Sequence, residues 1–181
     1  NHPSDDFLIK KIKDTNCKIY RGDLENVYKR FSNFSKKLND DDIVVRVTGD
    51  NIFVDHNLIN EVVNYFKKNN YNYACIDRKK SKLPYGISVE VFNLKTFRKW
   101  NAISNYEKEH VTPRILKFEK NIGFFHKKNL KNFYNLSCTM DTIFDYHKIK
   151  ICFEKSKSVK TNYVDLCNIL KNIKKREINN K

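Results

Sequence analysis

Asp50 is the residue of this sequence whose type and position best suit chemistry on a phosphate. It follows a β-branched run, Ile43 to Val47, and the turn-forming pair Thr48-Gly49. β-branched side chains lose rotamer freedom in helices and pack well on a pleat, so the run predicts a buried strand. Open α/β sheets collect ligands just beyond the carboxyl ends of such strands. Asp50 is therefore a candidate metal or phosphate-site ligand, with a turn residue that caps the next segment as the alternative.

The elements expected to position Asp50 alternate along the chain. After the strand, apolar residues at helical spacing predict a helix over 57–68, which makes a strand, an Asp-bearing loop and a helix. Further helices are predicted over 4–16, 23–38, 95–102, 106–117, 141–154 and 163–173, and strands or extended pieces over 17–20, 71–76, 87–92, 124–126 and 135–137. This alternation predicts an α/β fold, a three-layer sandwich in one domain over 1–173 with a charged tail over 174–181.

The charge of the chain permits a nucleic-acid partner but does not favour one. The formal net charge is +15 over 181 residues. The basic residues are mostly Lys beside Asn, spread along the chain, and no compact Arg-rich motif occurs. A positive surface would equally attract a nucleoside triphosphate or an anionic sugar. Salt-dependent binding to random DNA would favour the nucleic-acid alternative.

Cysteine usage and hydropathy bear on compartment. The cysteines are Cys17, Cys75, Cys138, Cys152 and Cys167, an odd number with no CxxC pair. A disulfide framework or a zinc cluster is not expected, and reduced thiols of a cytoplasmic protein fit better. No apolar run reaches membrane-spanning length, and no signal-peptide pattern opens the sequence, so no membrane partner is expected.

Four motifs occur in a fixed order, and together they carry a family resemblance. They are RVTGDNIFVDHNLINEVV (46–63), LPYGISVEVF (83–92), EKEHVTPRI (107–115) and CTMDTIFDY (138–146). In this order they resemble the cytidylyltransferases of the spore-coat-polysaccharide type, relatives of the acylneuraminate and 3-deoxy-manno-octulosonate enzymes that make CMP-sugars. The segments HPSDD (2–6) and YRGDLENVYKRF (20–31) fit the same family, so the resemblance covers nearly the whole chain.

The resemblance implies a Rossmann-like nucleotidyltransferase fold with a mixed, mostly parallel sheet. It implies an enzyme that joins CTP to a sugar or sugar acid and releases pyrophosphate, for surface polysaccharide or glycan synthesis. Asp50 matches the family's first magnesium carboxylate, and Asp141 matches the second. Two hard carboxylates can hold a Mg²⁺ ion that neutralises charge on the phosphates. The alternative for Asp141 is the N-cap of its helix.

The resemblance also implies contacts to the sugar. The matching residues are Tyr85 and Gly86 at the lip of the sugar pocket, Glu90 on the following strand, and His110 and Arg114 in the third motif. Glu90 is expected to contact a sugar hydroxyl or to support His110. The alternative for Glu90 is a solvent-facing residue of an alternating strand, and that for His110 is a structural group. Arg114, one residue past Pro113, could reach an anion at a helix start. Arg46, within the predicted strand, needs an anionic partner, and we favour a structural ion pair.

Two departures from the family pattern keep other interpretations open. Ser88 stands where the family often has Asp, and the family's first strand with its loop ARxxSxRLPxK does not occur in this chain. Either those residues lie upstream, or the chain is a non-catalytic domain that binds a sugar or a protein partner. A glycosyltransferase is a further alternative, although Asp40-Asp41-Asp42 precedes the strand, on the wrong side for its metal site. A homodimer remains possible, since relatives often dimerise.

Overall fold

The computed structural model describes residues 2–128, 131–156 and 162–179, and it divides them into two compact units. Unit 1 spans 1–44 and 92–121, and unit 2 spans 45–91 and 122–181. Unit 1 contains η1 (Pro3–Asp5), α1 (Asp6–Ile12), α2 (Val27–Phe34), η2 (Ser35–Lys37), α4 (Leu94–Lys99), α5 (Asn105–His110) and α6 (Pro113–Phe118). Unit 2 contains α3 (His56–Lys68), β2 (Tyr73–Ile76), β4 (Ile122–Phe125), α7 (Ile143–Ser156) and α8 (Tyr163–Asn179).

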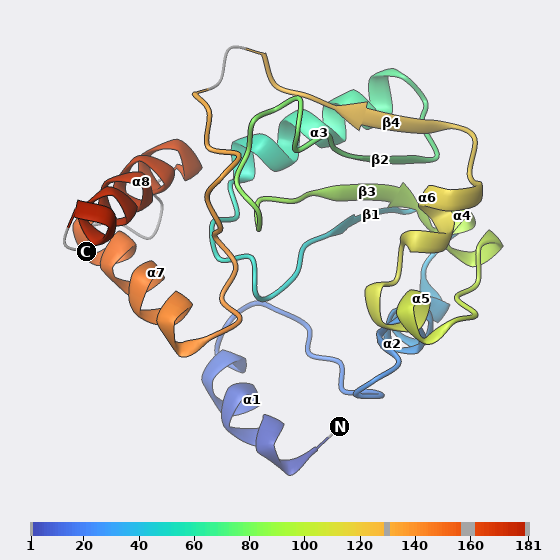
Figure 1. Cartoon of the computed structure of the whole chain (residues 1–181). Coiled ribbons are helices and arrows are strands. Elements are labelled where there is room, and N and C mark those ends of the chain that lie inside the picture. Colours follow the sequence, from blue (N-terminus) through green and yellow to red (C-terminus); the bar gives the residue numbers. More distant parts are fainter. Residues whose placement is uncertain (1, 129–130, 157–161, 180–181) are drawn as a thin grey trace. The chain divides into compact units, whose positions relative to one another are not determined.

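Four strands form one sheet in the order β1-β3-β2-β4. The boundary between the units passes through β1 (Ile43–Arg46) and β3 (Glu90–Asn93). β2 and β4 pair in parallel, in a register that runs from Tyr73 opposite Ile122 to Ile76 opposite Phe125. The arrow of β3 points the opposite way to that of β4 (Figure 1), so the sheet is mixed. The predicted α/β fold with a mixed sheet is therefore confirmed.

The prediction that the first strand is buried is wrong. β1 stands at one end of the strand order, where β3 is its neighbour. Its side chains alternate between exposed and half-buried, and Ile43 and Val45 are exposed. Strand propensity located the strand correctly, but a β-branched run fits an edge strand as well as a central one.

The helix α3 begins and packs as the sequence predicts. The Asp55 carboxylate caps its N-terminus, and Leu58, Val62 and Phe66, spaced four residues apart, are buried. α3 packs on β2 and β4, and Val62 and Phe66 share an apolar cluster with Ala74 and with residues 89 and 91. The burial of this stripe fixes where the chain leaves β1 and enters α3, which is the loop that carries Asp50.

A second apolar cluster holds the segment 136–138 in place. α7 packs against α8, and their buried side chains meet Leu136 and Cys138 from that segment and Leu83 and Ile87 from the loop before β3. Figure 1 shows α7 and α8 in orange and red, side by side. α8 continues to Asn179, beyond the predicted end at residue 173, while 180–181 of the predicted tail lie outside the described residues.

Unit 1 departs from the expected elements in several places. The predicted helix over 106–117 is two helices, α5 and α6, because Val111 between them has a positive φ of 72°. α2 begins at Val27 and not at residue 23, since the Asn26 side chain caps it. Residues 17–20 form no strand: Ile19 and Tyr20 are exposed, with no strand partner in the described chain.

Within the described ranges, no helix combines the length and apolar character needed to cross a membrane.

Candidate functional site

The segment 136–141 connects two loops that the sequence analysis placed at the site. The backbone N–H of Tyr85 donates to the Leu136 carbonyl (2.9 Å), and that of Cys138 donates to the Tyr85 carbonyl (2.7 Å). Further along, the N–H of Met140 donates to the Asp50 carbonyl (3.0 Å). The segment thus borders the predicted sugar loop at one end and the Asp50 loop at the other, all within unit 2.

The structure removes the capping explanation for Asp50. α3 is capped instead by Asp55, whose carboxylate accepts hydrogen bonds from the N–H groups of Asn57 (2.8 Å) and Leu58 (3.2 Å). Asp50 is exposed, and its carboxylate has no hydrogen bond or ion pair with any described residue. A turn residue with no local partner is free to bind a ligand.

The same holds for Asp141. The N-terminus of α7 is capped by Thr142, whose hydroxyl accepts from the N–H of Asp145 (3.2 Å), while the Asp145 carboxylate accepts from the N–H of Thr142 (3.1 Å). This reciprocal pair is a capping box, displaced by one residue from the predicted cap. Asp141 is exposed, and within the described chain no partner holds its carboxylate.

These two aspartates fit a magnesium ion better than a metal bound by protein alone. Asp141 directly follows Met140, whose N–H bonds to Asp50, so the two carboxylates stand on adjoining segments. Among the described residues, no group of three or more His, Cys, Asp or Glu side chains could hold a metal. Mg²⁺ prefers oxygen ligands and commonly binds through one or two carboxylates together with substrate phosphates. The donor set therefore fits Mg²⁺ bound with a nucleotide.

Tyr85 and Gly86 lie beside the same segment. Tyr85 has an exposed side chain. Gly86 has a φ of +94°, and a Cβ there would lie 2.7 Å from the backbone nitrogen of Thr139. The glycine is thus required by the close approach of segment 136–141, which is a structural reason in addition to the predicted approach of a ligand. The substrate role of both residues stays a prediction.

Sequence reasoning did not single out Asn51. Its side chain is 9% exposed, and its Nδ2 donates to the Ser88 hydroxyl (2.9 Å). Asn51 also forms an isolated antiparallel bridge with Thr139. It therefore links the Asp50 loop to the loop before β3 and to segment 136–141. Its position inside the TGDN motif was the available signal.

Glu90 is held by two neighbours. Its Oε2 lies 2.5 Å from Arg46 Nη1, and its Oε1 accepts from the Tyr73 hydroxyl (2.6 Å). The Arg46 and Glu90 side chains are 15% and 14% exposed. The structural ion pair predicted for Arg46 is confirmed, and Glu90 is its partner. A contact from Glu90 to a sugar hydroxyl stays a prediction.

His110 and Arg114 belong to unit 1. His110 is the last residue of α5, and its ring lies 4.4 Å from that of Tyr106, centroid to centroid. Arg114 Nη1 lies 3.4 Å from the Glu107 carboxylate. Hydrogen bonds from the N–H groups of Ile103 and Ser104, and then Arg114, hold the pKa of Glu107 below its usual value. The sugar contacts predicted for His110 and Arg114 remain predictions.

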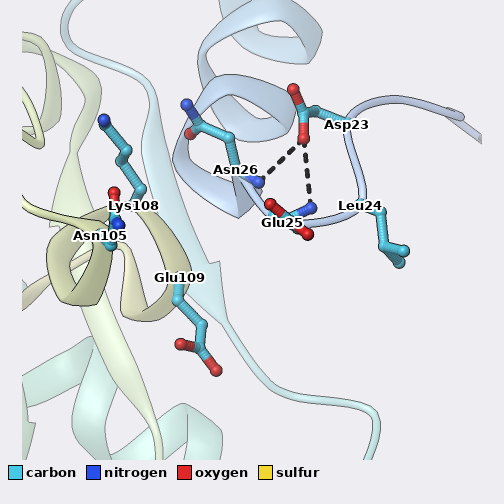
Figure 2. Close-up of a pocket in the computed structure, with 7 residues that line it drawn as sticks. All are labelled: Asp23, Leu24, Glu25, Asn26, Asn105, Lys108 and Glu109. Atoms are coloured by element: carbon cyan, nitrogen blue, oxygen red, sulfur yellow. Dashed lines mark hydrogen bonds between the residues drawn. The ribbon is translucent and has the colours of Figure 1, made fainter.

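A pocket of about 620 Å³ in unit 1 contains none of the predicted site residues (Figure 2). Its lining is Asp23, Leu24, Glu25, Asn26, Asn105, Lys108 and Glu109. The Asp23 carboxylate turns back onto its own loop, where it accepts from the N–H groups of Glu25 (3.1 Å) and Asn26 (3.0 Å). Three carboxylates against one lysine do not suit a triphosphate.

Two aspartates of the acidic triplet before β1, Asp40 and Asp42, have structural partners. The Asp40 carboxylate pairs with Arg98, and the Asp42 carboxylate accepts from the N–H of Asn39 (2.7 Å). Both interactions lie in unit 1 and account for these residues without a metal. This arrangement does not support the glycosyltransferase alternative.

One family model and two relatives match nearly the whole chain. A family model described as cytidylyltransferase matches residues 2–177. The chain is 32% identical over 171 residues to the uncharacterized protein MJ1063 of Methanocaldococcus jannaschii. This match covers 92% of the chain and 67% of MJ1063. It is 26% identical over 160 residues to the spore coat polysaccharide biosynthesis protein SpsF of Bacillus subtilis, with coverage of 84% and 64%. The chain thus spans about two thirds of the length of these relatives.

A solved structure shares the fold. The structure of a cytidylyltransferase from Leptospira borgpetersenii serovar Hardjo-bovis has a TM-score of 0.84. Its sequence is 24% identical, and the match covers 97% of this chain and 74% of that one.

Proposed function

Because the chain belongs to the cytidylyltransferase family, we propose that it activates a sugar or sugar acid by transfer of CMP from CTP, with release of pyrophosphate. The product would be a CMP-sugar for polysaccharide or glycan synthesis. The likeness to SpsF, which is named for spore coat polysaccharide biosynthesis, supports this choice of product.

The observation that carries the proposal is the pair of aspartates without protein partners. Asp50 and Asp141 stand on segments joined by the Met140–Asp50 hydrogen bond, and the helix caps beside them are Asp55 and Thr142. Two exposed carboxylates on adjoining segments can share one bound cation. A magnesium–nucleotide complex supplies that cation.

In the proposed reaction a sugar hydroxyl attacks the α-phosphorus of CTP, and the bond from that phosphorus to the pyrophosphate oxygen breaks. Asp50 and Asp141 would hold Mg²⁺, which when bound offsets the negative charge on the phosphate oxygens and the leaving pyrophosphate. Tyr85 and Gly86 would border the sugar beside segment 136–141, and Asn51 would keep the Asp50 loop against Ser88. The protein's work is positioning and charge stabilisation.

The test is a calorimetric titration of CTP into the chain, with and without magnesium. We expect CTP binding to depend on magnesium. Asp50→Ala and Asp141→Ala should each weaken that binding by about tenfold to a hundredfold, the loss typical of disturbing a metal site. Asp14→Ala is the matched control, since it removes an exposed aspartate from unit 1. Pyrophosphate release with a panel of sugars then tests turnover.

The outcomes separate the alternatives. Magnesium-dependent CTP binding lost in both variants supports the enzyme. Binding that survives both substitutions would place the nucleotide elsewhere and refute the assigned metal site. No binding of CTP by the folded chain, or by a chain extended upstream, would favour a non-catalytic domain.

A further inference from the structure

A pocket of about 360 Å³ lies in unit 2, between α8 and the turn 132–136. Three lysines of α8 line one wall of it: Lys171, Lys174 and Lys175. Residues three and four apart are neighbours on one face of a helix, so the three side chains leave α8 on the same side. The pocket therefore gathers three positive charges on one wall.

The opposite wall is held against α8 by apolar packing. Phe133 and Leu136 line the pocket, and both are buried in an apolar cluster that also contains Leu170 of α8. The N–H of Leu136 donates to the Phe133 carbonyl (2.9 Å), which closes the turn. The N–H of Phe133 donates to the Lys82 carbonyl (2.8 Å) and ties the turn to the loop before β3. Burial and hydrogen bonds thus fix both walls of the pocket.

Polar groups of the turn add donors to those of the lysines. Asn132 and Asn135 line the pocket. The Oδ1 of Asn132 accepts from the N–H of Tyr134 (3.1 Å), so the Nδ2 of the same side chain serves as a donor. Lys174 Nζ donates to the Asn135 carbonyl (3.1 Å), which uses one of its three N–H donors and holds the ammonium group at the pocket.

No carboxylate lies in the lining of this pocket, as far as the described side chains go. The pocket of unit 1 has the opposite character, with three carboxylates and one lysine in its lining. The positive charge of the chain is therefore concentrated at the pocket beside α8 and is not a feature of every pocket. A concave wall of one sign of charge raises the local concentration of anions.

We propose that this pocket binds a small molecule that carries a diphosphate group, at a site separate from Asp50 and Asp141. Lysine ammonium groups are compact charges with rotatable donors, and they bind phosphate oxygens as point charges. A volume near the lower end of the range for ligand pockets suits a small molecule. The inference does not depend on the proposed function, because the pocket contains none of the residues assigned to CTP, magnesium or the sugar.

The test follows the full chain by NMR while pyrophosphate is added. A chelator is present, so that no magnesium can hold phosphates at the two aspartates. We expect saturable shifts of the backbone amides of 131–136 and 171–175. Pyrophosphate should bind about tenfold more tightly than inorganic phosphate, the gain expected of one further charge-assisted hydrogen bond.

A parallel titration with ADP separates two sources of the diphosphate group. Tighter binding of ADP would mean that the nucleoside also contacts the pocket and that the ligand is a nucleotide. Equal or weaker binding of ADP would assign the site to the free diphosphate.

A triple variant removes the charges of the pocket: Lys171→Gln, Lys174→Gln and Lys175→Gln. We expect it to weaken pyrophosphate binding by more than about tenfold, since several charge-assisted hydrogen bonds are lost together. If the triple variant fails to fold, Lys174→Gln alone decides, with an expected loss of about threefold to tenfold.

The matched control removes three exposed lysines of unit 2 that do not line the pocket: Lys67→Gln, Lys68→Gln and Lys155→Gln. It changes the net charge of the chain by the same amount. Pyrophosphate binding should weaken by less than about threefold, because salt at physiological strength screens charges that lie more than about 8 Å away.

Each outcome supports or overturns the inference. Shifts confined to the pocket, lost in the pocket variant and kept in the control, support it. Equal weakening in both triple variants would show a general attraction of anions to a basic chain and overturn it. Shifts at 48–51 and 139–141 in place of the pocket would assign the phosphates to the aspartate loops and also overturn it. A failure of magnesium-dependent CTP binding would refute the proposed function and leave this inference standing.

Discussion

At the scale of single residues, three aspartates near α3 and α7 differ in what holds them. Asp55 is buried and accepts from Asn57, from Leu58 and, over a long sequence separation, from the N–H of Tyr163 (3.2 Å). It therefore joins the N-termini of α3 and α8. Asp50 and Asp141 make no such contacts with described residues. Removal of an exposed side chain that has no partner, such as Asp50 or Asp141, breaks no contact of the folded chain. Removal of the Asp55 side chain, in contrast, leaves buried N–H groups unpaired.

We accordingly predict that substitution of Asp55 destabilises the fold, whereas substitution of Asp50 or Asp141 hardly changes its stability. Asp55→Ala should lower the free energy of unfolding by about 2–4 kcal/mol, the sum of a lost N-cap and one unpaired buried donor. Asp50→Asn and Asp141→Asn should change it by less than about 0.5 kcal/mol, as is usual for exposed residues. Urea unfolding followed by circular dichroism measures all three. A large loss of stability in Asp50→Asn would show that its carboxylate has a structural role.

Glu90 gives a second prediction at this scale. Replacement by Gln removes the charge that faces Arg46 and leaves a half-buried guanidinium without its counter-ion. We expect Glu90→Gln to lose about 3 kcal/mol of stability, as when one partner of a largely buried ion pair is removed. Because Arg46 is then the unpaired group, the double variant Arg46→Met with Glu90→Gln should recover part of that loss. Additive losses in the same urea experiment would contradict the ion-pair explanation.

The sequence singled out Asp50 and Asp141 as candidate metal ligands but could not say what surrounds them. The motif assigned Asp50 and Asp141, and in each case the competing role as a helix cap was open. The choice between cap and ligand could be made only once Asp55 and Thr142 were known to be the caps. The apolar pattern could not identify them, because a helix start can move by a residue or two without changing that pattern. Asn51 was overlooked because a side chain that links two loops has no periodic signature.

At the scale of elements, the close approach of Gly86 to segment 136–141 is the contact that shapes the site. Gly86→Ala would place a methyl group 2.7 Å from the Thr139 nitrogen, on a backbone with a φ of +94°. We expect a loss of about 1–3 kcal/mol in stability and weaker magnesium-dependent CTP binding, because the segment that leads to Asp141 must shift. Chemical denaturation and the calorimetric titration measure the two effects.

Gly49→Ala is the matched control for that prediction. Gly49 precedes Asp50, and a Cβ at this position would meet nothing within 4 Å. The variant should fold with unchanged or slightly higher stability, since alanine reduces the freedom of the unfolded chain. Equal losses in both variants would mean that the glycines matter for a reason other than the contact with Thr139.

Helices were more predictable than strands for a physical reason. The apolar spacing of α3 determines both its type and its buried face, and the observed helix, His56–Lys68, nearly matches the prediction. A strand of four residues such as β1 can be predicted only from the β-propensity of its residues. That propensity does not indicate whether other strands pair with it on both sides. The break at Val111 was unpredictable because a buried β-branched residue rarely adopts positive φ.

At the scale of the whole molecule, the thiols offer a measure of how well unit 2 is packed. Cys138, Cys152 and Cys167 are buried among α7, α8 and segment 136–141, and Cys75 is partly buried in β2. Burial raises the pKa of Cys152 to about 11 and that of Cys75 to about 12. A hydrogen bond with Cys167, together with burial, raises the pKa of Cys138. Cys17, in unit 1, is exposed.

We therefore predict that a thiol reagent at about pH 8 modifies one cysteine quickly in the folded chain, because only an accessible thiolate reacts. All five of the chain's cysteines should react after unfolding, and Cys17→Ser should abolish the fast reaction. Stability should also fall as the pH rises above the ordinary thiol value of 9.0. The unfolded chain then loses protons that the buried thiols keep, so alkaline conditions favour unfolding. Fast reaction of Cys152 or Cys167 as well would show that α7 and α8 open readily and that segment 136–141 lacks the rigid support that Asp141 needs.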